Sequence, residues 1–367
     1  MKKVAKSGRL TDLLPLAGAI GLTVAAREVI VRAREADLAG QVALITGGSR
    51  GLGLAIAREL AAEGCRLAIC ARDVDELDRA ARELEASGAE VIAFTCDVAN
   101  EHDVATMVAG VEAHYGQVDL LFTNAGVIEV GQFSQQDVAD FRQAMDIMFW
   151  GTLYPILAVL PGMKARGAGR IATITSIGGK ISVPHLLPYS SAKFAAVGLS
   201  EGLAAELAED GITVTTIVPG LMRTGSHLHA QFKGDDARQR DEYEWFALGA
   251  TNPFVPRADR AARIIVKAVK RGELERTFTL PFDLAIRVHG MAPATTIRLM
   301  RLMDALLPKG EVAAADNAKV PGDEVERRLN SRAWKSVTAL GEDAARHFNE
   351  LPVRDSSSPV TGSRPES

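Results

Sequence analysis

A tyrosine and a lysine four positions apart are the residues in this sequence best suited to move a proton. Tyr189 and Lys193 stand in the segment YSSAK, at the start of a predicted helix, where residues four apart share one face. A free phenol has a pKa of about 10, too high for proton exchange at neutral pH, and a neighbouring ammonium group lowers it. Tyr189 is therefore a candidate general acid or base, with Lys193 as the group that lowers its pKa.

A serine upstream of this pair extends it into a catalytic trio. Ser176 follows a strand predicted over residues 171–175. The carboxyl ends of parallel strands border the ligand crevice of such a sheet, so the hydroxyl is placed to hold a substrate oxygen beside the phenol. A tyrosine and a lysine at this spacing are common on solvated helices, and it is the serine that turns the pair into a predicted site.

A glycine-rich turn near the start of the chain predicts a phosphate-binding site. Residues 42–53 read VALITGGSRGLG, an apolar strand followed by a turn and the beginning of a helix. Gly47, Gly51 and Gly53 permit tight turning and close backbone approach. This geometry presents backbone N–H groups and the positive end of a helix dipole to an anion. Between a strand and a helix, the pattern favours a dinucleotide cofactor over a turn without a ligand.

These residues together resemble the short-chain dehydrogenase/reductase family. The motifs that carry the resemblance cover about residues 40–225 in the family's order, and their combination is highly specific. They are Thr46-Gly47-x-x-x-Gly51-x-Gly53, Asp97-Val98, Asn124-Ala125-Gly126, Ser176, Tyr189-x-x-x-Lys193, and Pro219-Gly220 with Thr224.

The resemblance implies a role for each position. Ser176 would orient a carbonyl that Tyr189 protonates as hydride arrives, while Lys193 would also hold the nicotinamide ribose. A homodimer or homotetramer, formed through the helices at 134–160 and 189–209, is implied as well. The other implied cofactor contacts are Gly47, Ser49, Arg50, Gly51, Leu52 and Gly53 at the pyrophosphate and adenosine ribose, Asp97 and Val98 at the adenine, Asn124, Ala125 and Gly126 beneath the cofactor, and Pro219, Gly220 and Thr224 at the nicotinamide.

Charges near the second predicted strand favour NADP over NAD as the cofactor. A carboxylate about 20 residues beyond the glycine turn binds the ribose 2′-hydroxyl of NAD, whereas an arginine there suits the 2′-phosphate of NADP. Arg72 lies in that region and Arg50 lies inside the turn. Two guanidinium groups near one phosphate favour NADP. Asp73, one residue later, keeps NAD open as the alternative.

One position departs from the family's pattern. The family places an asparagine three residues before a glycine of the long helix, where it supports a proton relay through water to the lysine. Here Gly151 is that glycine and Met148 stands in place of the asparagine. A thioether donates no hydrogen bond and accepts only weakly. Either the relay runs differently or turnover is slow, so a cofactor-binding scaffold or sensor with weak catalysis is the alternative to a full enzyme.

Strand and helix patterns alternate from residue 40 onward. This alternation predicts an α/β fold with a doubly wound, Rossmann-type parallel sheet of about seven strands. Ser134 is expected to cap the long helix, which ends before Pro161, and His227 and His229 are expected to be solvated in a mobile loop or helical lid over residues 227–244. Strands are expected at 42–45, 67–70, 91–95, 120–122, 171–175, 212–218 and 278–280, and helices at 52–62, 75–87, 104–115, 134–160, 189–209 and 257–271.

The chain divides into four predicted parts. Residues 1–39 hold an uncharged run at 13–26, shorter than the roughly 20 residues that span a bilayer. A signal peptide, a membrane-associated segment and a helix packed on the domain are the alternatives, and a cofactor supplied in the cytoplasm disfavours export. Residues 40–282 form the catalytic domain, 283–308 an apolar and basic helical extension, and 309–367 a polar, largely disordered tail with one helix near 324–348.

Composition and net charge limit the kinds of ligand and partner to expect. A net charge of −4 over 367 residues gives no reason to expect nucleic acid. Three cysteines without a CxxC pair indicate buried thiols in a reducing compartment, and two histidines two positions apart are too few for a metal site. The apolar segments, with Leu186-Leu187-Pro188 before Tyr189, favour an apolar substrate. We therefore expect a cytoplasmic NADP-dependent oxidoreductase for a carbonyl or an alcohol, with attachment to the inner face of a membrane left open.

Overall fold

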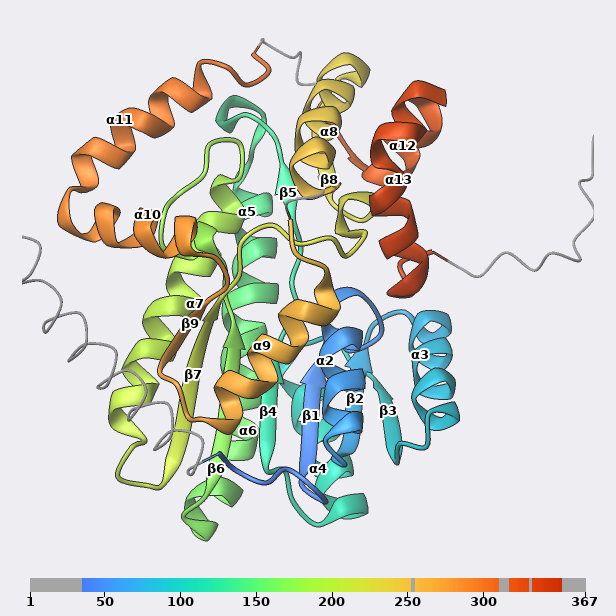
Figure 1. The fold of residues 1–367 in the computed structure, drawn as a ribbon, viewed down its shortest axis with the longest axis vertical. Coiled ribbons are helices and arrows are strands. Elements are labelled where there is room, and N and C mark those ends of the chain that lie inside the picture. The colour runs from blue at the N-terminus through green and yellow to red at the C-terminus, as the bar shows by residue number, and fades with distance from the viewer. Residues whose placement is uncertain (1–34, 252–254, 310–316, 330–331, 352–367) are drawn as a thin grey trace, which may run out of the picture.

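The fold is known from a computed structural model that describes residues 35–251, 255–309, 317–329 and 332–351 (Figure 1). The uncharged run at 13–26, and with it most of the predicted N-terminal part, lies outside the described residues.

A seven-stranded parallel sheet forms the centre of the molecule and confirms the predicted fold class. The strand order is β3-β2-β1-β4-β6-β7-β9, so the direction of winding reverses between β1 and β4. A ligand crevice opens at the carboxyl ends of the strands at such a reversal. The strands are β1 (Val42–Thr46), β2 (Arg66–Ala71), β3 (Val91–Thr95), β4 (Leu120–Thr123), β6 (Gly169–Ile174), β7 (Ile212–Val218) and β9 (Glu275–Thr277).

Helices cover both faces of the sheet and bury its side chains. Neighbouring residues of β1 point to opposite faces, so Ile45 packs in one core with Leu54, while Leu44 packs in the other with Val108. The first face is covered by α2 (Gly51–Ala62), α3 (Val74–Ala86) and α9 (Ala258–Lys270). The second face is covered by α4 (Glu101–Tyr115), α6 (Gly151–Arg166) and α7 (Leu187–Glu206).

The long helix of the second face differs from its prediction at both ends. Asp137, and not Ser134, caps it, because the Asp137 carboxylate accepts hydrogen bonds from the N–H groups of Ala139 and Asp140. The helix then runs as α5 (Val138–Met145), a π-helical turn η2 (Asp146–Trp150) and α6. The helix continues past Pro161. This proline is exposed, and because water can bind the backbone carbonyl that loses its partner there, the missing hydrogen bond costs little.

This helix also bears on the question of the membrane. Among the described residues, only Val138–Arg166 is long and apolar enough to cross a bilayer, judged by length and composition. Its side chains Ile156, Val159 and Met163 lie in the core against the sheet. The helix is thereby explained as a core element.

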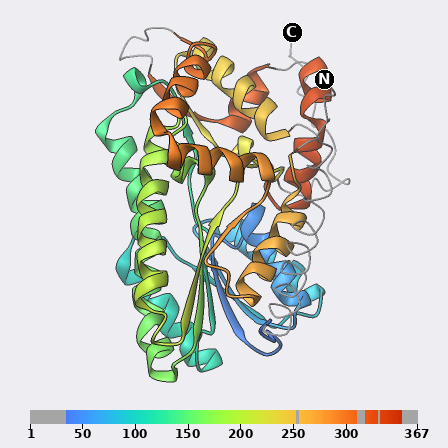
Figure 2. The same cartoon turned by 60° about the vertical axis from the view of Figure 1, so that its left-hand side comes forward.

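The last predicted strand is displaced by three residues. β9 ends at Thr277, and residues 278–280 lead instead into α10 (Leu280–Met291), where Pro281 occupies the first turn that proline favours. α11 (Pro293–Asp304) follows, and Thr296 is the one buried residue in the pair. Figures 1 and 2 show both helices at the carboxyl-end side of the sheet.

A second, three-stranded sheet lies where a mobile loop and a disordered tail were predicted. Its order is β10-β8-β5. The mobile loop and the disordered tail are wrong for the described residues, which form two helices in the tail instead of one. The helical alternative for residues 227–244 agrees with a helix that begins at Asp236. The elements are β5 (Glu129–Val130), β8 (Gln231–Gly234), β10 (Ala318–Pro321), α8 (Asp236–Thr251), α12 (Gly322–Leu329) and α13 (Arg332–His347).

Buried charges fix the second sheet to the main domain. Lys233 of β8 forms an ion pair with Asp140 of α5, and Lys319 of β10 lies 2.7 Å from Glu129 and 3.0 Å from Asp140. His227 is buried rather than solvated. These are pairings between distant segments, which local sequence patterns do not display.

Candidate active site

The carboxyl end of β6 brings the predicted catalytic trio together. Ser176 follows β6, and its Oγ accepts a hydrogen bond from the N–H of Gly178 at 3.0 Å. Tyr189, in the first turn of α7, lies beside Ser176, since a Cβ on Gly178 would lie 3.1 Å from the Tyr189 ring and 3.5 Å from Ser176 Oγ. The two hydroxyl groups therefore lie side by side, as binding one substrate oxygen requires.

Lys193 lies one turn further along α7, and its side chain is buried. Its Nζ donates a hydrogen bond to the carbonyl oxygen of Ile174 at 2.8 Å and lies 5.9 Å from the centre of the Tyr189 ring. Burial lowers the pKa of Lys193 to about 8, because the charged ammonium is poorly solvated there.

The expected effect of Lys193 on Tyr189 is not what the structure shows. Burial raises the pKa of Tyr189, and the hydrogen bond from Ser176 only partly opposes that rise. The ammonium of Lys193 is directed at a backbone carbonyl rather than at the phenol. Desolvation of the phenol therefore outweighs the stabilisation of its anion by a cation.

Met148 is fully buried in the π-helical turn η2, beside the catalytic lysine. A Cβ placed on Gly126 would lie 3.8 Å from Lys193 Nζ and 3.9 Å from Met148 Cγ, so the two side chains flank this glycine. Thr152 Oγ1 donates a hydrogen bond to the carbonyl oxygen of Met148 at 2.9 Å. π-Helical turns cluster at functional sites. The methionine thus places an apolar group beside the lysine.

The glycine turn has the geometry of a phosphate cradle. Gly47 and Gly51 have φ angles of 64° and 57°, which strain any side chain. A Cβ on Gly53 would lie 2.0 Å from the carbonyl oxygen of Gly47. Asn124 braces the turn from β4, because its Nδ2 donates to Gly47 O at 3.1 Å. Ala125 donates its N–H to Thr46 Oγ1 at 3.2 Å.

Residues from the end of the described chain lie in this cradle, and sequence analysis missed them. The N–H of Gly51 donates to the carbonyl oxygen of Phe348 at 2.8 Å. A Cβ on Gly51 would lie 2.7 Å from Glu350 Oε1. The cradle residues themselves fit a pyrophosphate, but the chain's own backbone and carboxylate occupy part of that space. Only a contact map would have found a partner about 300 positions away.

The two predicted cofactor-selecting arginines have different surroundings. Arg50 Nη1 lies 3.2 Å from Glu76, and its Nε lies 3.6 Å from Glu350. Arg72 is exposed and lines an open pocket of about 330 Å³. Asp73 caps α3, accepting the N–H of Glu76 at 2.8 Å. The pocket is lined by Arg72, Asp97, Ala99, Ala139, Arg142, Gln143, Asp146 and Ile147.

The remaining predicted positions lie in packed surroundings. Val98 is buried against Gly151, where an added Cβ would meet Val98 Cγ2 at 2.7 Å. Leu52, in the first turn of α2, is half-buried against the core. Pro219 and Gly220 follow β7 and are covered by α10, since a Cβ on Gly220 would lie 1.9 Å from the Phe282 ring.

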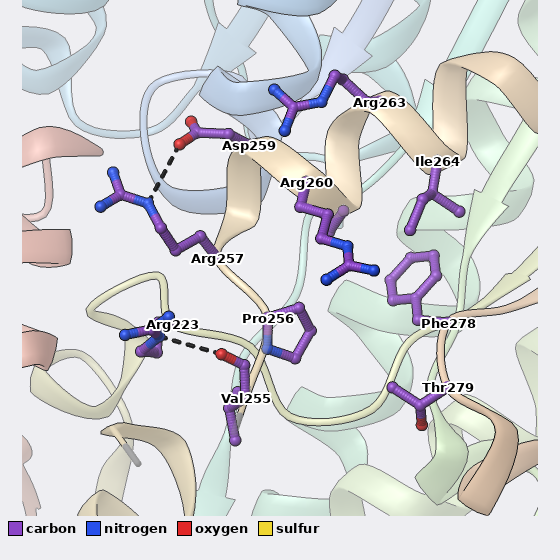
Figure 3. Close-up of a pocket in the computed structure, with 11 residues that line it drawn as sticks. Arg223, Val255, Pro256, Arg257, Asp259, Arg260, Arg263, Ile264, Phe278 and Thr279 are labelled. Atoms are coloured by element: carbon purple, nitrogen blue, oxygen red, sulfur yellow. Dashed lines mark hydrogen bonds and ion pairs between the residues drawn. The ribbon is translucent and has the colours of Figure 1, made fainter. Parts of the chain in front are cut away.

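The loop after β7 separates the cradle from a basic pocket of about 470 Å³ (Figure 3). Thr224 is buried, and its Oγ1 accepts the N–H of Ser226 at 3.1 Å. Its neighbour Arg223 lines the pocket and donates to the carbonyl oxygen of Val255 at 3.0 Å. Arg257, Arg260 and Arg263 from the start of α9 add to the positive charge, which Asp259 partly offsets.

Comparison with known proteins places the chain in a family whose matched region contains the residues described above. Residues 41–232 match the family model described as short chain dehydrogenase. This range includes the glycine turn, the catalytic trio and the loop after β7. A putative ketoacyl reductase of Streptomyces coelicolor is 40% identical over 188 residues, which make up 50% of this chain and 71% of that protein.

Two solved structures share the fold. A short chain dehydrogenase/reductase of Burkholderia phymatum, in complex with NAD, has a TM-score of 0.64 at 23% identity and covers 71% of this chain and 96% of its own. L-Sorbose reductase of Gluconobacter frateurii, complexed with NADPH and L-sorbose, has a TM-score of 0.59 at 26% identity and covers 66% of this chain and 97% of its own. Proteins of this fold thus bind either nicotinamide cofactor.

Replacing Lys193 by arginine keeps a positive charge at this position but removes its loss of a proton near pH 8. The ammonium with a pKa of about 8 loses its proton as the pH rises through that value, so we expect the rate of carbonyl reduction to fall there. A guanidinium stays charged beyond that range. The pH profile of Lys193→Arg, measured from pH 6 to 10, should lack this fall even if misplacement of the group lowers the rate about 100-fold.

The control is Lys180→Arg, because Lys180 forms ion pairs with Glu201 and Glu275 away from the trio. It should keep the wild-type profile. An alkaline fall at the same pH in Lys193→Arg would show that another group titrates.

Proposed function

The chain belongs to the short-chain dehydrogenase/reductase family of oxidoreductases, and from that premise we propose that it uses NADP to interconvert a carbonyl and an alcohol on an apolar substrate. The observation that carries the proposal is the convergence of Ser176, Tyr189 and Lys193 at the end of β6. A binding module has no need of this trio. We further propose that reduction is the cellular direction.

Each member of the trio has a role that its surroundings support. Ser176, held by the N–H of Gly178, keeps its hydroxyl beside that of Tyr189 and holds the carbonyl oxygen. Tyr189 is protonated at neutral pH because burial raises its pKa, and it donates the proton to that oxygen. Lys193 supplies a positive charge beside the phenol below about pH 8. A bound, reduced nicotinamide supplies the hydride to the carbonyl carbon.

Removing the phenol hydroxyl tests the proposed chemistry. We expect NADPH-dependent reduction of apolar ketones and aldehydes, followed by the absorbance of NADPH, and a loss of kcat of about 100- to 10,000-fold in Tyr189→Phe. Tyr154→Phe is the matched control, because Tyr154 stacks on Trp150 away from the trio and should keep full activity.

Three outcomes would contradict parts of the proposal. Full activity of Tyr189→Phe would remove the phenol from the mechanism, and reaction of small polar ketones alone would exclude the apolar substrate. Cofactor binding without reduction of any carbonyl would favour the alternative function, a scaffold or sensor. The buried Met148 beside Lys193 is the observation that favours that alternative.

The preference for NADP is supported by the pocket that Arg72 lines. Arg142 from α5, which sequence analysis did not single out, faces the same pocket as Arg72 and Asp97. Two exposed guanidinium groups suit a 2′-phosphate. Asp73, the residue that favours NAD, already accepts the backbone N–H of Glu76 as the cap of α3.

Removing Arg72 should discriminate between the two cofactors. A charge-assisted hydrogen bond contributes about 1.5–3 kcal/mol, so Arg72→Ala should weaken NADPH binding roughly 10- to 100-fold and leave NADH binding nearly unchanged. Nicotinamide fluorescence measures both. Arg276→Ala, on the exposed edge strand β9, should change neither. Tighter binding of NADH than of NADPH by the wild-type chain would refute the preference and bring Asp73 forward.

The apolar substrate and attachment to the inner face of a membrane are supported by α10 and α11. These helices expose Leu280, Met291 and Leu302, and the turn after α11 exposes Leu306, each by 65–83% of its surface. Exposed arginines at positions 287, 298 and 301 accompany them. Apolar side chains that bury in the lipid boundary, flanked by cations, suit a membrane with anionic lipids.

Vesicle flotation tests this attachment. The full chain should float with vesicles that contain phosphatidylserine. The double variant Leu302→Asp with Leu306→Asp should stay with unbound protein at the bottom of the gradient, because two charges oppose burial of this segment in the interface. Leu274→Asp is the control, since Leu274 is 69% exposed near β9, away from the pair. Equal flotation of the double variant and the wild type would assign attachment to another part of the chain.

A homodimer or homotetramer completes the proposal. Trp150, Leu157 and Phe194, on the two helices implied in subunit contact, are each exposed by 40–51%. Large apolar side chains gathered on adjacent helices favour an interface between copies of the chain.

A further inference from the structure

Three residues at the end of the described chain occupy the entrance of the phosphate cradle; we call residues 348–350 the strap. The carbonyl oxygen of Phe348 accepts the N–H of Gly51, the first residue of α2. Asn349 Nδ2 donates to the carbonyl oxygens of Ser49 at 2.8 Å and of Glu76 at 2.9 Å. The Phe348 carbonyl thus accepts a hydrogen bond from the turn as a phosphate does there, while Asn349 fixes the strap through hydrogen bonds that it donates.

A carboxylate completes this likeness to a phosphate. The Glu350 side chain is 4% exposed and lies over Gly51, 3.6 Å from Arg50 Nε and 3.1 Å from His229 Nε2. His229 also contacts Arg50 through Nδ1. Burial lowers the pKa of His229 to about 4, so the ring is neutral. Nδ1 can then accept from Arg50 while Nε2 donates to the backbone carbonyl oxygen of Glu350 at 2.9 Å. A carboxyl group therefore lies where the cradle attracts anions.

The strap is anchored on both sides. The Phe348 ring is fully buried in the core, with the Arg58 guanidinium 5.5 Å from its centre, and Arg79 Nε donates to Asn349 Oδ1 at 2.9 Å. α13, which precedes the strap, packs closely on the loop after β7, where a Cβ on Gly225 would lie 2.5 Å from Ala345 Cα. Figure 1 shows α13 ending above α2 and α3.

The geometry points to the strap as a built-in competitor of the cofactor: residues 348–350 fill the pyrophosphate position of the glycine turn, and NADP binds only when they leave it. This inference rests on the proposed function, since it takes NADP as the ligand of the turn. The Phe348 carbonyl takes the N–H of Gly51, and Glu350 Oε1 fills the space directly over Gly51, 2.7 Å from where a Cβ would lie. Glu76 and Glu350 hold Nη1 and Nε of Arg50, which draws this guanidinium away from a phosphate.

The carboxylate holds its place weakly, which makes displacement feasible. Burial raises the pKa of Glu350 to about 7, with Arg50 opposing the rise and Glu76 adding to it. A group that is poorly stabilised as an anion is a weaker ligand for the turn than a pyrophosphate with several charges. The strap consequently keeps the turn closed to weak anions and yields to a strong one.

Variants of the strap in the full-length chain test the competition. Asn349→Ala removes the hydrogen bonds to Ser49 and Glu76, and Glu350→Gln removes the charge. The apparent Kd for NADPH equals the Kd of the open site divided by the fraction of molecules in which the site is open. If the strap is in place in at least nine-tenths of the molecules, opening the site should lower the apparent Kd about tenfold or more. Both variants should therefore bind NADPH more tightly than the wild type. The control is Glu342→Gln, whose carboxylate pairs with Arg346 on the surface of α13.

Hydrogen exchange of the wild-type chain supplies a second readout. NADPH should speed exchange of the backbone N–H groups in residues 345–351 while it slows exchange in residues 49–53. A ligand that leaves the strap in place would protect both segments. Tighter binding in both strap variants together with faster exchange at 345–351 supports the inference.

Unchanged or weaker NADPH binding in both variants overturns it, because Glu350 and Asn349 would then belong to the cofactor-bound site or lie outside it. If no nicotinamide cofactor binds to any variant, the proposed function fails, and inorganic pyrophosphate becomes the probe. Pyrophosphate that speeds exchange at 345–351 still supports displacement of the strap, and pyrophosphate that protects residues 49–53 without releasing the strap refutes it.

Discussion

The first turn of α2 presents backbone N–H groups that no carbonyl of the same helix accepts, and the site is built around this constraint. β1 ends immediately before the turn, so the groups point out of the carboxyl edge of the sheet. Three glycines let the backbone approach so closely that a side chain at Gly53 would overlap the carbonyl of Gly47. Asn124 then fixes the turn from the neighbouring strand. The strap and a cofactor are two solutions to one need, an acceptor for the N–H of Gly51.

Burial governs the catalytic side of the crevice. Tyr189 and Lys193 share a poorly solvated environment that raises the pKa of the phenol and lowers that of the ammonium. Each group is thereby moved toward its neutral form, as desolvation requires. Charge attraction along the helix would act on Tyr189 in the opposite direction, but Lys193 gives its hydrogen bond to Ile174. Helical spacing predicts a lowered pKa for the phenol of Tyr189, whereas burial raises it.

Much of the fold could be predicted because its signals are local. The apolar runs of β1, β3 and β7, with the turns that bound them, locate the parallel sheet within a residue of its observed strands. Several motif residues, such as Asn124, Ser176 and Pro219, follow the ends of such strands, and Tyr189 and Lys193 begin the helix α7. β5 and β10 have two and four residues, too few to show a pattern, and ion pairs of Lys233 and Lys319 with distant carboxylates fix them. The strap escaped prediction for the same reason, since Asn349 reaches Ser49 across 300 positions.

That separation along the chain has a consequence for the order in which the protein is made. The ribosome synthesises the cradle, the catalytic trio, all seven strands of the main sheet and the helix α9 that packs with α2 before it reaches the codon for Phe348, and domains fold as units during synthesis. A nascent chain thus has an open cradle for as long as synthesis of its last hundred or so residues takes. Cofactor present in the cell meets the turn before any competitor exists, so a newly made molecule can leave the ribosome already loaded, whereas one that has lost its cofactor must open the strap to bind again.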